Sequence, residues 1–238
     1  MKQPDQTEIG ARAYYDRIAP DYDAMLETAG NQAIRACFWR HVETLVPEPS
    51  RILDFGAGSG IDAAYFAGLG HHVTAYDLSE GMLAILHRRC AAQIAAGSIA
   101  PIAGTLEDIR SDLAARAPFD AIVSNFAVFS TIAEIGPVLR LFGEMVRPGG
   151  IVLVSIQNPW RVGDMRTRRF WRALLLLAFT RTLRFRGADL AQTFHHMPGQ
   201  IRRAARADFV PEPSPRPACA RSCFGPTGTF RLVALRRR

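Results

Sequence analysis

A glycine-rich segment, Asp54-x-Gly56-x-Gly58-x-Gly60, has residue types and spacing suited to holding a ligand. It follows a short apolar run and precedes a run with helical spacing, residues 61–69. Because glycine lacks a Cβ atom, the backbone can turn sharply here and approach a ligand closely. The free amides and the dipole of the following helix favour a carboxylate or phosphate at its N-terminus. The segment therefore predicts a nucleotide-like ligand.

A second candidate is Asp77, which ends the apolar run 73–76 and lies 17 residues beyond Gly60. At the end of a strand, its carboxylate can accept hydrogen bonds from two ribose hydroxyls, each worth about 1.5–3 kcal/mol. The alternative is an N-cap for the next helix, although Ser79 can fill that role. Ribose binding is the favoured interpretation.

Similar glycine-rich loops bind nicotinamide and flavin dinucleotides, so the spacing of the glycines matters. Gly60 comes two residues after Gly58, whereas the fingerprint G-x-G-x-x-G would place a glycine where Ile61 stands. An NAD(P)-dependent reductase is therefore the less favoured alternative.

Strands and helices alternate around these residues, as in a parallel sheet covered by helices on both faces. We expect a doubly wound, Rossmann-like α/β fold with a mostly parallel sheet, N-terminal helices and a helical insertion after strand five. The expected strands are 51–55, 73–76, 99–104, 119–125 and 151–156, with a last edge strand at 230–235. The expected helices are 8–30 (interrupted at Pro20), 31–46, 61–69, 80–96, 106–115, 132–145 and 166–186. Residues 1–46, 47–160 and 161–238 would form an N-terminal helical part, a ligand-binding core and an arginine-rich C-terminal part of one domain.

Five motifs stand in one order along the chain: YDRIAPDYD (15–23), LDFGAGSG (53–60), YDLSEGML (76–83), FDAIVSN (119–125) and RPGG (147–150). Together they resemble the class I S-adenosylmethionine (SAM) dependent methyltransferases, in particular the small-molecule type related to ubiquinone and menaquinone biosynthesis. The resemblance covers roughly residues 12–156. It implies a methyltransferase with SAM as its cofactor and a lid in residues 1–46.

The resemblance also implies which residues bind the cofactor. They are Asp54, Gly56, Ala57, Gly58, Gly60, Asp77, Leu78, Met82, Thr105, Leu106, Glu107, Asn125, Phe126 and Tyr22. The glycine segment would hold the methionine part, and Leu78 and Met82 would border the adenine. The acid that usually reads the adenine amino group is replaced by Thr105, which leaves Glu107 or Asp108 as substitutes.

Two of these assignments have structural alternatives. Asn125 and Phe126 would face the sulfonium and the methyl acceptor, unless they only cap a strand. Tyr22, together with Tyr14 and Tyr15, would touch the cofactor or close the pocket, although packing of an aromatic helix face explains them equally well.

The chemistry itself requires few catalytic residues, because a sulfonium already activates the methyl group and the protein mainly aligns the reactants. If the acceptor needs a general base, His195 and His196 are the candidates by residue type. No metal site is expected, because Cys219 and Cys223 lack further ligands at metal-binding spacing. A SAM-binding protein without turnover remains an open alternative.

Charge is unevenly distributed along the chain. Residues 1–160 hold 12 Lys and Arg against 18 acids, while residues 161–238 hold 17 Arg against 4 acids. The basic part indicates an anionic partner, although a GC-rich genome would also favour arginine over lysine. The acceptor is therefore expected to be a small apolar or anionic molecule.

The segment 166–186 could lie on a membrane surface, or it could be a cap helix whose arginines are solvated, which we favour. A nucleic-acid acceptor is disfavoured, because Asn125-Phe-Ala-Val replaces the Asn/Asp-Pro-Pro-aromatic motif of such enzymes. The sequence has no N-terminal signal pattern and no apolar run of about 18 residues. We therefore expect a cytoplasmic protein with reduced cysteines. It would contact a membrane peripherally if residues 166–186 bind one.

Overall fold

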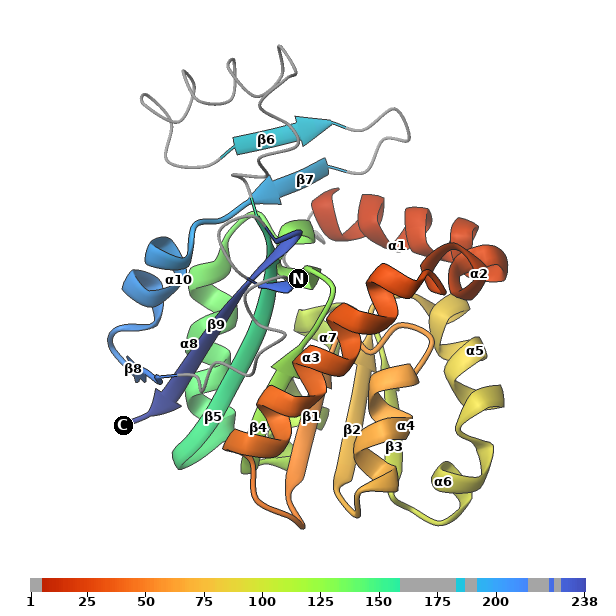
Figure 1. Ribbon diagram of the computed structural model, residues 1–238, viewed down its shortest axis with the longest axis horizontal. Coiled ribbons are helices and arrows are strands. Elements are labelled where there is room, and N and C mark those ends of the chain that lie inside the picture. The colour runs from red at the N-terminus through yellow and green to blue at the C-terminus, as the bar shows by residue number, and fades with distance from the viewer. Residues whose placement is uncertain (1–5, 159–182, 187–191, 214–222, 225–227) are drawn as a thin grey trace.

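A seven-stranded sheet forms the centre of the computed structural model, which describes residues 6–158, 183–186, 192–213, 223–224 and 228–238 (Figure 1). The strand order is β3-β2-β1-β4-β5-β9-β8. The first five strands pair in parallel, while β9 runs antiparallel to β5 and β8. The strands are β1 (Arg51–Phe55), β2 (His72–Asp77), β3 (Ile99–Ala103), β4 (Phe119–Ser124), β5 (Val146–Gln157), β8 (Phe209–Pro211) and β9 (Phe230–Arg237). The expected doubly wound, mostly parallel sheet is confirmed.

Helices cover both faces of the sheet (Figure 1). One buried cluster packs α3 (Ala29–Leu45), α4 (Ile61–Gly68) and α5 (Glu80–Arg89) against the strands. The other packs α7 (Leu106–Arg116), α8 (Ile135–Met145) and α10 (Pro198–Ala205). The remaining helices are α1 (Gln6–Ile18), η1 (Ala19–Asp21), α2 (Tyr22–Leu26), α6 (Ala91–Ala95) and η2 (Val128–Thr131).

The order of the strands places a ligand site between β1 and β4. The chain moves outward from β1 to β3 and then returns to pair β4 with the other side of β1. Ligands of open α/β sheets bind at the carboxyl ends of the strands where the order reverses in this way. The glycine segment follows β1, and Asn125 follows β4, so both predicted parts of the site meet at this point.

Several expected elements are wrong in detail. The helix expected at 80–96 is divided at Cys90 into α5 and α6, and the helix expected from residue 132 begins at Ile135. The last strand is not at the edge of the sheet, because β8 pairs with its free side. A short apolar run looks the same in an edge strand and in an internal one, so only the pairing decides.

The expected helix 166–186 is wrong at its end, where Leu183–Arg186 forms strand β6 and pairs with β7 (Gln192–His195). The rest of that helix lies outside the described residues. Within the described ranges, no helix is long and apolar enough to cross a membrane. Cys90 is a buried free thiol, whereas Cys37 is disulfide-bonded, so the expectation of reduced cysteines is wrong at Cys37.

Candidate functional site

The glycine segment folds back onto β2 immediately after β1 ends. The amides of Gly56 and Ala57 both donate to the carbonyl oxygen of Tyr76, each at 2.8 Å. Gly56 has a φ of +82°, and a Cβ atom there would lie 2.4 Å from Cγ2 of Val128. A side chain at this position would therefore meet both backbone strain and a steric clash. Glycine is required here by the close approach of η2 to the loop.

Asp77 lies at the end of β2 and organises the two loops beside it. Its Oδ2 accepts a hydrogen bond from the Gly58 amide at 2.7 Å, and its Oδ1 accepts one from the Ser79 amide at 2.9 Å. Ser79 is the N-cap of α5, since its hydroxyl accepts from the Met82 amide at 3.1 Å. Asp77 is therefore not needed as the helix cap, which leaves its carboxylate facing the cavity described next.

A cavity of about 590 Å³ opens at the carboxyl ends of β1, β2 and β4. Most of the residues assigned to the cofactor from the sequence line it. These are Tyr22, Gly56, Ala57, Gly58, Asp77, Leu78, Met82, Thr105, Leu106, Glu107, Asn125 and Phe126. Asp54 and Gly60 are not among the lining residues. Gly60 instead packs under Leu86 of α5, where a Cβ atom would lie 2.6 Å from Cγ of that leucine.

Asp54 lies beneath the glycine segment and is only 1% exposed. Burial, followed by the nearby negative charge of Asp62, raises its pKa well above the usual value. Its Oδ2 has no hydrogen-bond partner in the described part of the chain. Asp54 is thus a buried acid below the cavity floor.

A buried polar network joins α3, α4 and the end of β4. Oδ1 of Asp62 accepts from Nη1 of Arg35 at 2.6 Å and from Nε1 of Trp39 at 2.8 Å, and its Oδ2 accepts from Nδ2 of Asn125 at 3.0 Å. Oδ1 of Asn125 in turn accepts from the Phe126 amide at 2.8 Å. Asn125 therefore does more than end a strand, because it joins the strand to the two helices.

The same network holds Phe126 in an uncommon backbone conformation. Its φ is +52°, a region that residues with side chains adopt rarely. The guanidinium of Arg35 lies 4.5 Å from the centre of the Phe126 ring, within cation–π range. The sequence analysis missed Arg35 and Asp62, which both line the cavity. Nothing in the local pattern signals them, because they are 27 residues apart and meet only when α3 packs beside α4.

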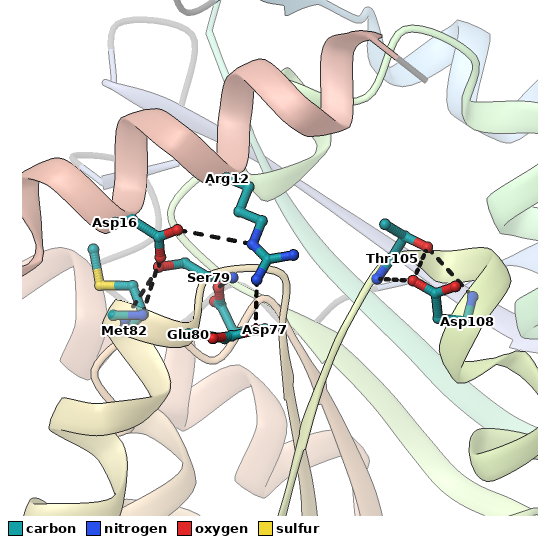
Figure 2. Close-up of polar contacts among 9 residues, drawn as sticks. Arg12, Asp16, Asp77, Ser79, Glu80, Met82, Thr105 and Asp108 are labelled. Carbon is teal, nitrogen blue, oxygen red and sulfur yellow. Dashed lines mark hydrogen bonds and ion pairs between the residues drawn. The ribbon is translucent and has the colours of Figure 1, made fainter. Parts of the chain in front are cut away.

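The segment after β3 contains a capping box. Asp108 Oδ2 accepts from the Thr105 hydroxyl at 2.6 Å, and the Thr105 hydroxyl accepts from the Asp108 amide at 3.3 Å (Figure 2). Asp108 is therefore engaged in starting α7 and does not line the cavity, whereas Glu107 does. Of the two proposed substitutes for the adenine-reading acid, the geometry favours Glu107.

Two tyrosines of the N-terminal helices cover the cofactor end of the cavity. Tyr15 and Tyr22 both line it, and their ring centres are 6.3 Å apart. Tyr22 lies over the glycine segment, with its Cε1 3.7 Å from the place where a Cβ of Gly58 would be. Burial raises the pKa of Tyr15 to about 12 and that of Tyr22 still further, so both are neutral hydrogen-bond donors near pH 7.

The two candidate bases lie outside the cavity lining. His196 is 4% exposed, and its Nε2 is 2.8 Å from the carbonyl oxygen of Ile132. Burial lowers its pKa, which keeps the ring neutral. Neither His195 nor His196 lines the cavity, whereas Phe194 of the same strand does. The geometry therefore does not support a general base at either histidine.

The far end of the cavity is lined mainly by apolar side chains. It is formed by η2, the loop after it, the start of α8 and strand β7, which contribute Ile132, Pro137, Val138 and Phe194 together with the polar Thr131 and Glu134. The sequence analysis did not predict these residues as part of the site. They come from segments that are remote in the chain, and a local pattern of apolar residues looks like ordinary core.

The ionisation of Asp77 leads to a prediction about pH. Burial raises its pKa to about 6, opposed by hydrogen bonds from Ser79 and Gly58, with Asp16 as a further raising charge. The neutral form of Asp77 therefore predominates in the unliganded fold below pH 6. The contribution of Asp77 to folding stability is fully present below about pH 4 and is lost as the pH rises through 6. A ribose hydroxyl donates best to the ionised carboxylate. Ligand affinity should therefore rise with pH, whereas the contribution of Asp77 to folding stability falls.

We therefore expect the affinity for S-adenosylhomocysteine to be highest above pH 7 and to fall by about tenfold per unit below pH 6. Calorimetric titrations between pH 5 and 8 measure this. The other groups facing Asp77 are Asp16, Tyr15, Tyr22, Tyr76 and Asp54. Asp54 also has a raised pKa, so Asp77→Asn is needed as a control. If the affinity of this variant still falls below pH 6, a group other than Asp77 causes the pH dependence.

Known proteins with similar sequences are methyltransferases. Residues 52–150 match the family described as "Methyltransferase domain". The chain is 30% identical over 162 residues to the demethylmenaquinone methyltransferase of Clavibacter sepedonicus, which is 66% of this chain and 61% of that protein. It is 28% identical over 149 residues to the tRNA 5-carboxymethoxyuridine methyltransferase of Escherichia coli (strain K12), and this match covers 60% of this chain and 56% of that protein. The chain thus matches about three fifths of the length of these relatives.

The fold is also that of solved methyltransferases. A crystal structure of the Burkholderia thailandensis 1,6-didemethyltoxoflavin-N1-methyltransferase, with 1,6-didemethyltoxoflavin and S-adenosylhomocysteine bound, superposes with a TM-score of 0.65 at 20% identity. The superposition covers 100% of this chain and 91% of that one. Residues 52–150 thus match a methyltransferase domain, and the chain shares the fold of that solved methyltransferase.

Proposed function

We propose that this chain transfers the methyl group of SAM to a small apolar molecule. The observation that carries the proposal is that one cavity is lined both by Gly56 and Asp77 and by the apolar side chains of Val138 and Phe194. A cofactor at the glycine end and an acceptor at the apolar end would therefore share one space. Pockets of a few hundred cubic ångströms that are mostly apolar, with few polar groups, are typical of small-molecule sites.

The residues at the glycine end fit the cofactor. The missing Cβ of Gly58 leaves space beneath Tyr22, and the missing Cβ of Gly56 lets Val128 pack against the loop. The carboxylate of Asp77 is available for ribose hydroxyls, Leu78 and Met82 offer apolar surface for the adenine, and Glu107 offers an acceptor for its amino group. The hydroxyls of Tyr15 and Tyr22 are neutral donors suited to the carboxylate of the methionine part.

When bound, SAM supplies an activated methyl group attached to a sulfonium. The task of the protein is then to align the acceptor with that group and to exclude water. Asn125 and Phe126 lie at the end of β4, between the two ends of the cavity, and their network holds them in place. Tyr15 and Tyr22 cover the opening. No residue on the described part of the cavity wall is assigned as a general base.

An anionic acceptor and a membrane contact through residues 166–186 stay predictions, because most of the arginine-rich segment lies outside the described residues. Liposome sedimentation with and without residues 166–186 tests the second. Equal sedimentation of both forms would remove the segment from membrane binding.

Thermal denaturation with added ligand tests the cofactor. A ligand that binds only the folded state raises the melting temperature by mass action, with about 2.7 kcal/mol gained at a hundredfold excess over Kd. We expect SAM and S-adenosylhomocysteine to raise it and NADPH to leave it unchanged. Stabilisation by NADPH alone would favour a reductase instead.

Turnover with methyl-labelled SAM tests the reaction. We expect label to appear in a small-molecule fraction of a metabolite pool extracted with organic solvent. Transfer to tRNA, the acceptor named for the Escherichia coli relative, would contradict the small-molecule proposal. Binding of SAM without transfer to either pool would identify a binding protein.

A further inference from the structure

The N-terminal lid, residues 6–26 (α1, η1 and α2), carries two Tyr-Asp pairs, Tyr15-Asp16 and Tyr22-Asp23. In each pair the tyrosine lines the cavity, while the aspartate contacts the loops that flank it. We propose that Asp16 and Asp23 are positioning residues that clamp the lid onto the cofactor loops, so that cofactor can exchange only when both contacts open. This inference rests on the proposed function, because it assigns SAM to the covered end of the cavity.

The first contact joins α1 to the start of α5. Oδ1 of Asp16 accepts from the Ser79 hydroxyl at 2.6 Å and from the Gly81 amide at 3.0 Å (Figure 2). Arg12, one turn earlier on α1, bonds Asp16 and also Glu80. Since Ser79 donates its amide to Asp77 and caps α5 ahead of Met82, Asp16 supports the same loop that presents Asp77 and Met82 to the cavity.

The second contact joins the lid to the glycine segment. Oδ1 of Asp23 accepts from the Ser59 hydroxyl at 2.6 Å, and Oδ2 pairs with Arg89. Arg89 ends α5 and also donates its Nε to the Ser59 carbonyl at 3.0 Å. The two aspartates therefore hold the lid at the first and last turns of α5, and Tyr22, next to Asp23, lies over Gly58.

Close backbone packing supports the clamp. A Cβ atom on Gly81 would lie 3.1 Å from Cβ of Ala19 and 3.2 Å from Cα of Asp16. The lid thus approaches α5 as closely as a glycine permits. The hydrogen bonds of Asp16 and Asp23 go to the loops beside Asp77 and the glycine segment, whereas α1 also contacts η2 and β7 at the apolar end.

The clamp is tested by measuring, with rapid filtration, the rate at which radiolabelled S-adenosylhomocysteine leaves the full chain. We expect Asp16→Ala and Asp23→Ala each to speed release by about tenfold, since each loses two or more hydrogen bonds. Asp21→Ala is the matched control, because Asp21 is an exposed acid of the same lid with no hydrogen bond or ion pair in the described structure. Release at the wild-type rate in both variants would overturn the clamp, whereas failure of the wild type to bind would overturn the cofactor assignment.

A crosslink tests the same inference without removing either aspartate. The Cβ positions of residues 19 and 81 are 3.1 Å apart, and a small outward shift of the lid brings them to the roughly 3.8 Å of a disulfide. We expect Ala19→Cys combined with Gly81→Cys to release the ligand at least tenfold more slowly when oxidised, and to regain the faster rate in reductant. Equal rates of ligand release from the oxidised and the reduced variant would contradict the proposal. This second test also remains valid if the alanine variants fail to fold.

Discussion

Asp77→Ala is expected to weaken S-adenosylhomocysteine binding by about a hundredfold, because two charge-assisted hydrogen bonds to the ribose contribute roughly 3 kcal/mol together. Calorimetric titration of the two proteins above pH 7 measures the loss. The fold should survive, since burial raises the pKa of Asp77 to about 6, and the ionised carboxylate present above pH 7 therefore does not stabilise the unliganded fold.

The melting temperature without ligand is the control for this variant. We expect it to equal or exceed that of the wild type, because removing a buried carboxylate relieves a desolvation cost. The amides of Gly58 and Ser79 lose their acceptor, which partly offsets that gain. Unchanged affinity in a folded variant would exclude Asp77 as a ribose ligand.

Asp62→Ala is expected to lower the free energy of unfolding by about 3–5 kcal/mol, because it leaves a buried charge without its partner. The side chains of Arg35 and Asp62 are 13% and 7% exposed, so water cannot replace the lost contact. Trp39 and Asn125 lose the same acceptor. Chemical denaturation followed by fluorescence measures the change.

Two further variants show whether the loss of stability comes from the buried hydrogen-bond network or from the removal of a charge alone. Asp62→Asn keeps one carbonyl oxygen for Arg35 and Trp39 and should lose less stability than the alanine variant. Glu144→Ala removes the partner of Arg110 in an ion pair whose side chains are 56% and 57% exposed, and it should cost less than 1 kcal/mol. Equal losses in Asp62→Ala and Glu144→Ala would show that the buried network does not stabilise the fold.

The positions of the binding loops followed from local sequence. The run 51–55, the glycines after it and Asp77 were recognisable because strand, turn and cap each depend on residues close together in the chain. Their order along the chain then implied the parallel sheet, since a strand followed by a helix and a second strand pairs in one handedness. Strands β1 to β4 lie where that pattern placed them, within one residue at each end, whereas β5 begins at Val146, five residues earlier than expected.

The walls of the cavity did not follow in the same way. Arg35 on α3, Val138 on α8 and Phe194 on β7 are brought together only by packing across the sheet. His196 illustrates the opposite error, since its residue type suggested a base, whereas the fold buries it against the Ile132 carbonyl. Residue type states which chemistry a side chain can perform, but burial and neighbours decide whether it faces a ligand.

The sequence by itself determined the cofactor end of this protein, because a glycine turn after a strand and an acid after the next strand are local features with a local physical cause. Only the tertiary structure decided what surrounds that end: the Asp62 network beneath Phe126, the aspartates that hold the lid, and the apolar wall opposite Asp77. These depend on contacts between residues tens of positions apart, and such contacts have no counterpart in the periodicity or spacing of a single chain.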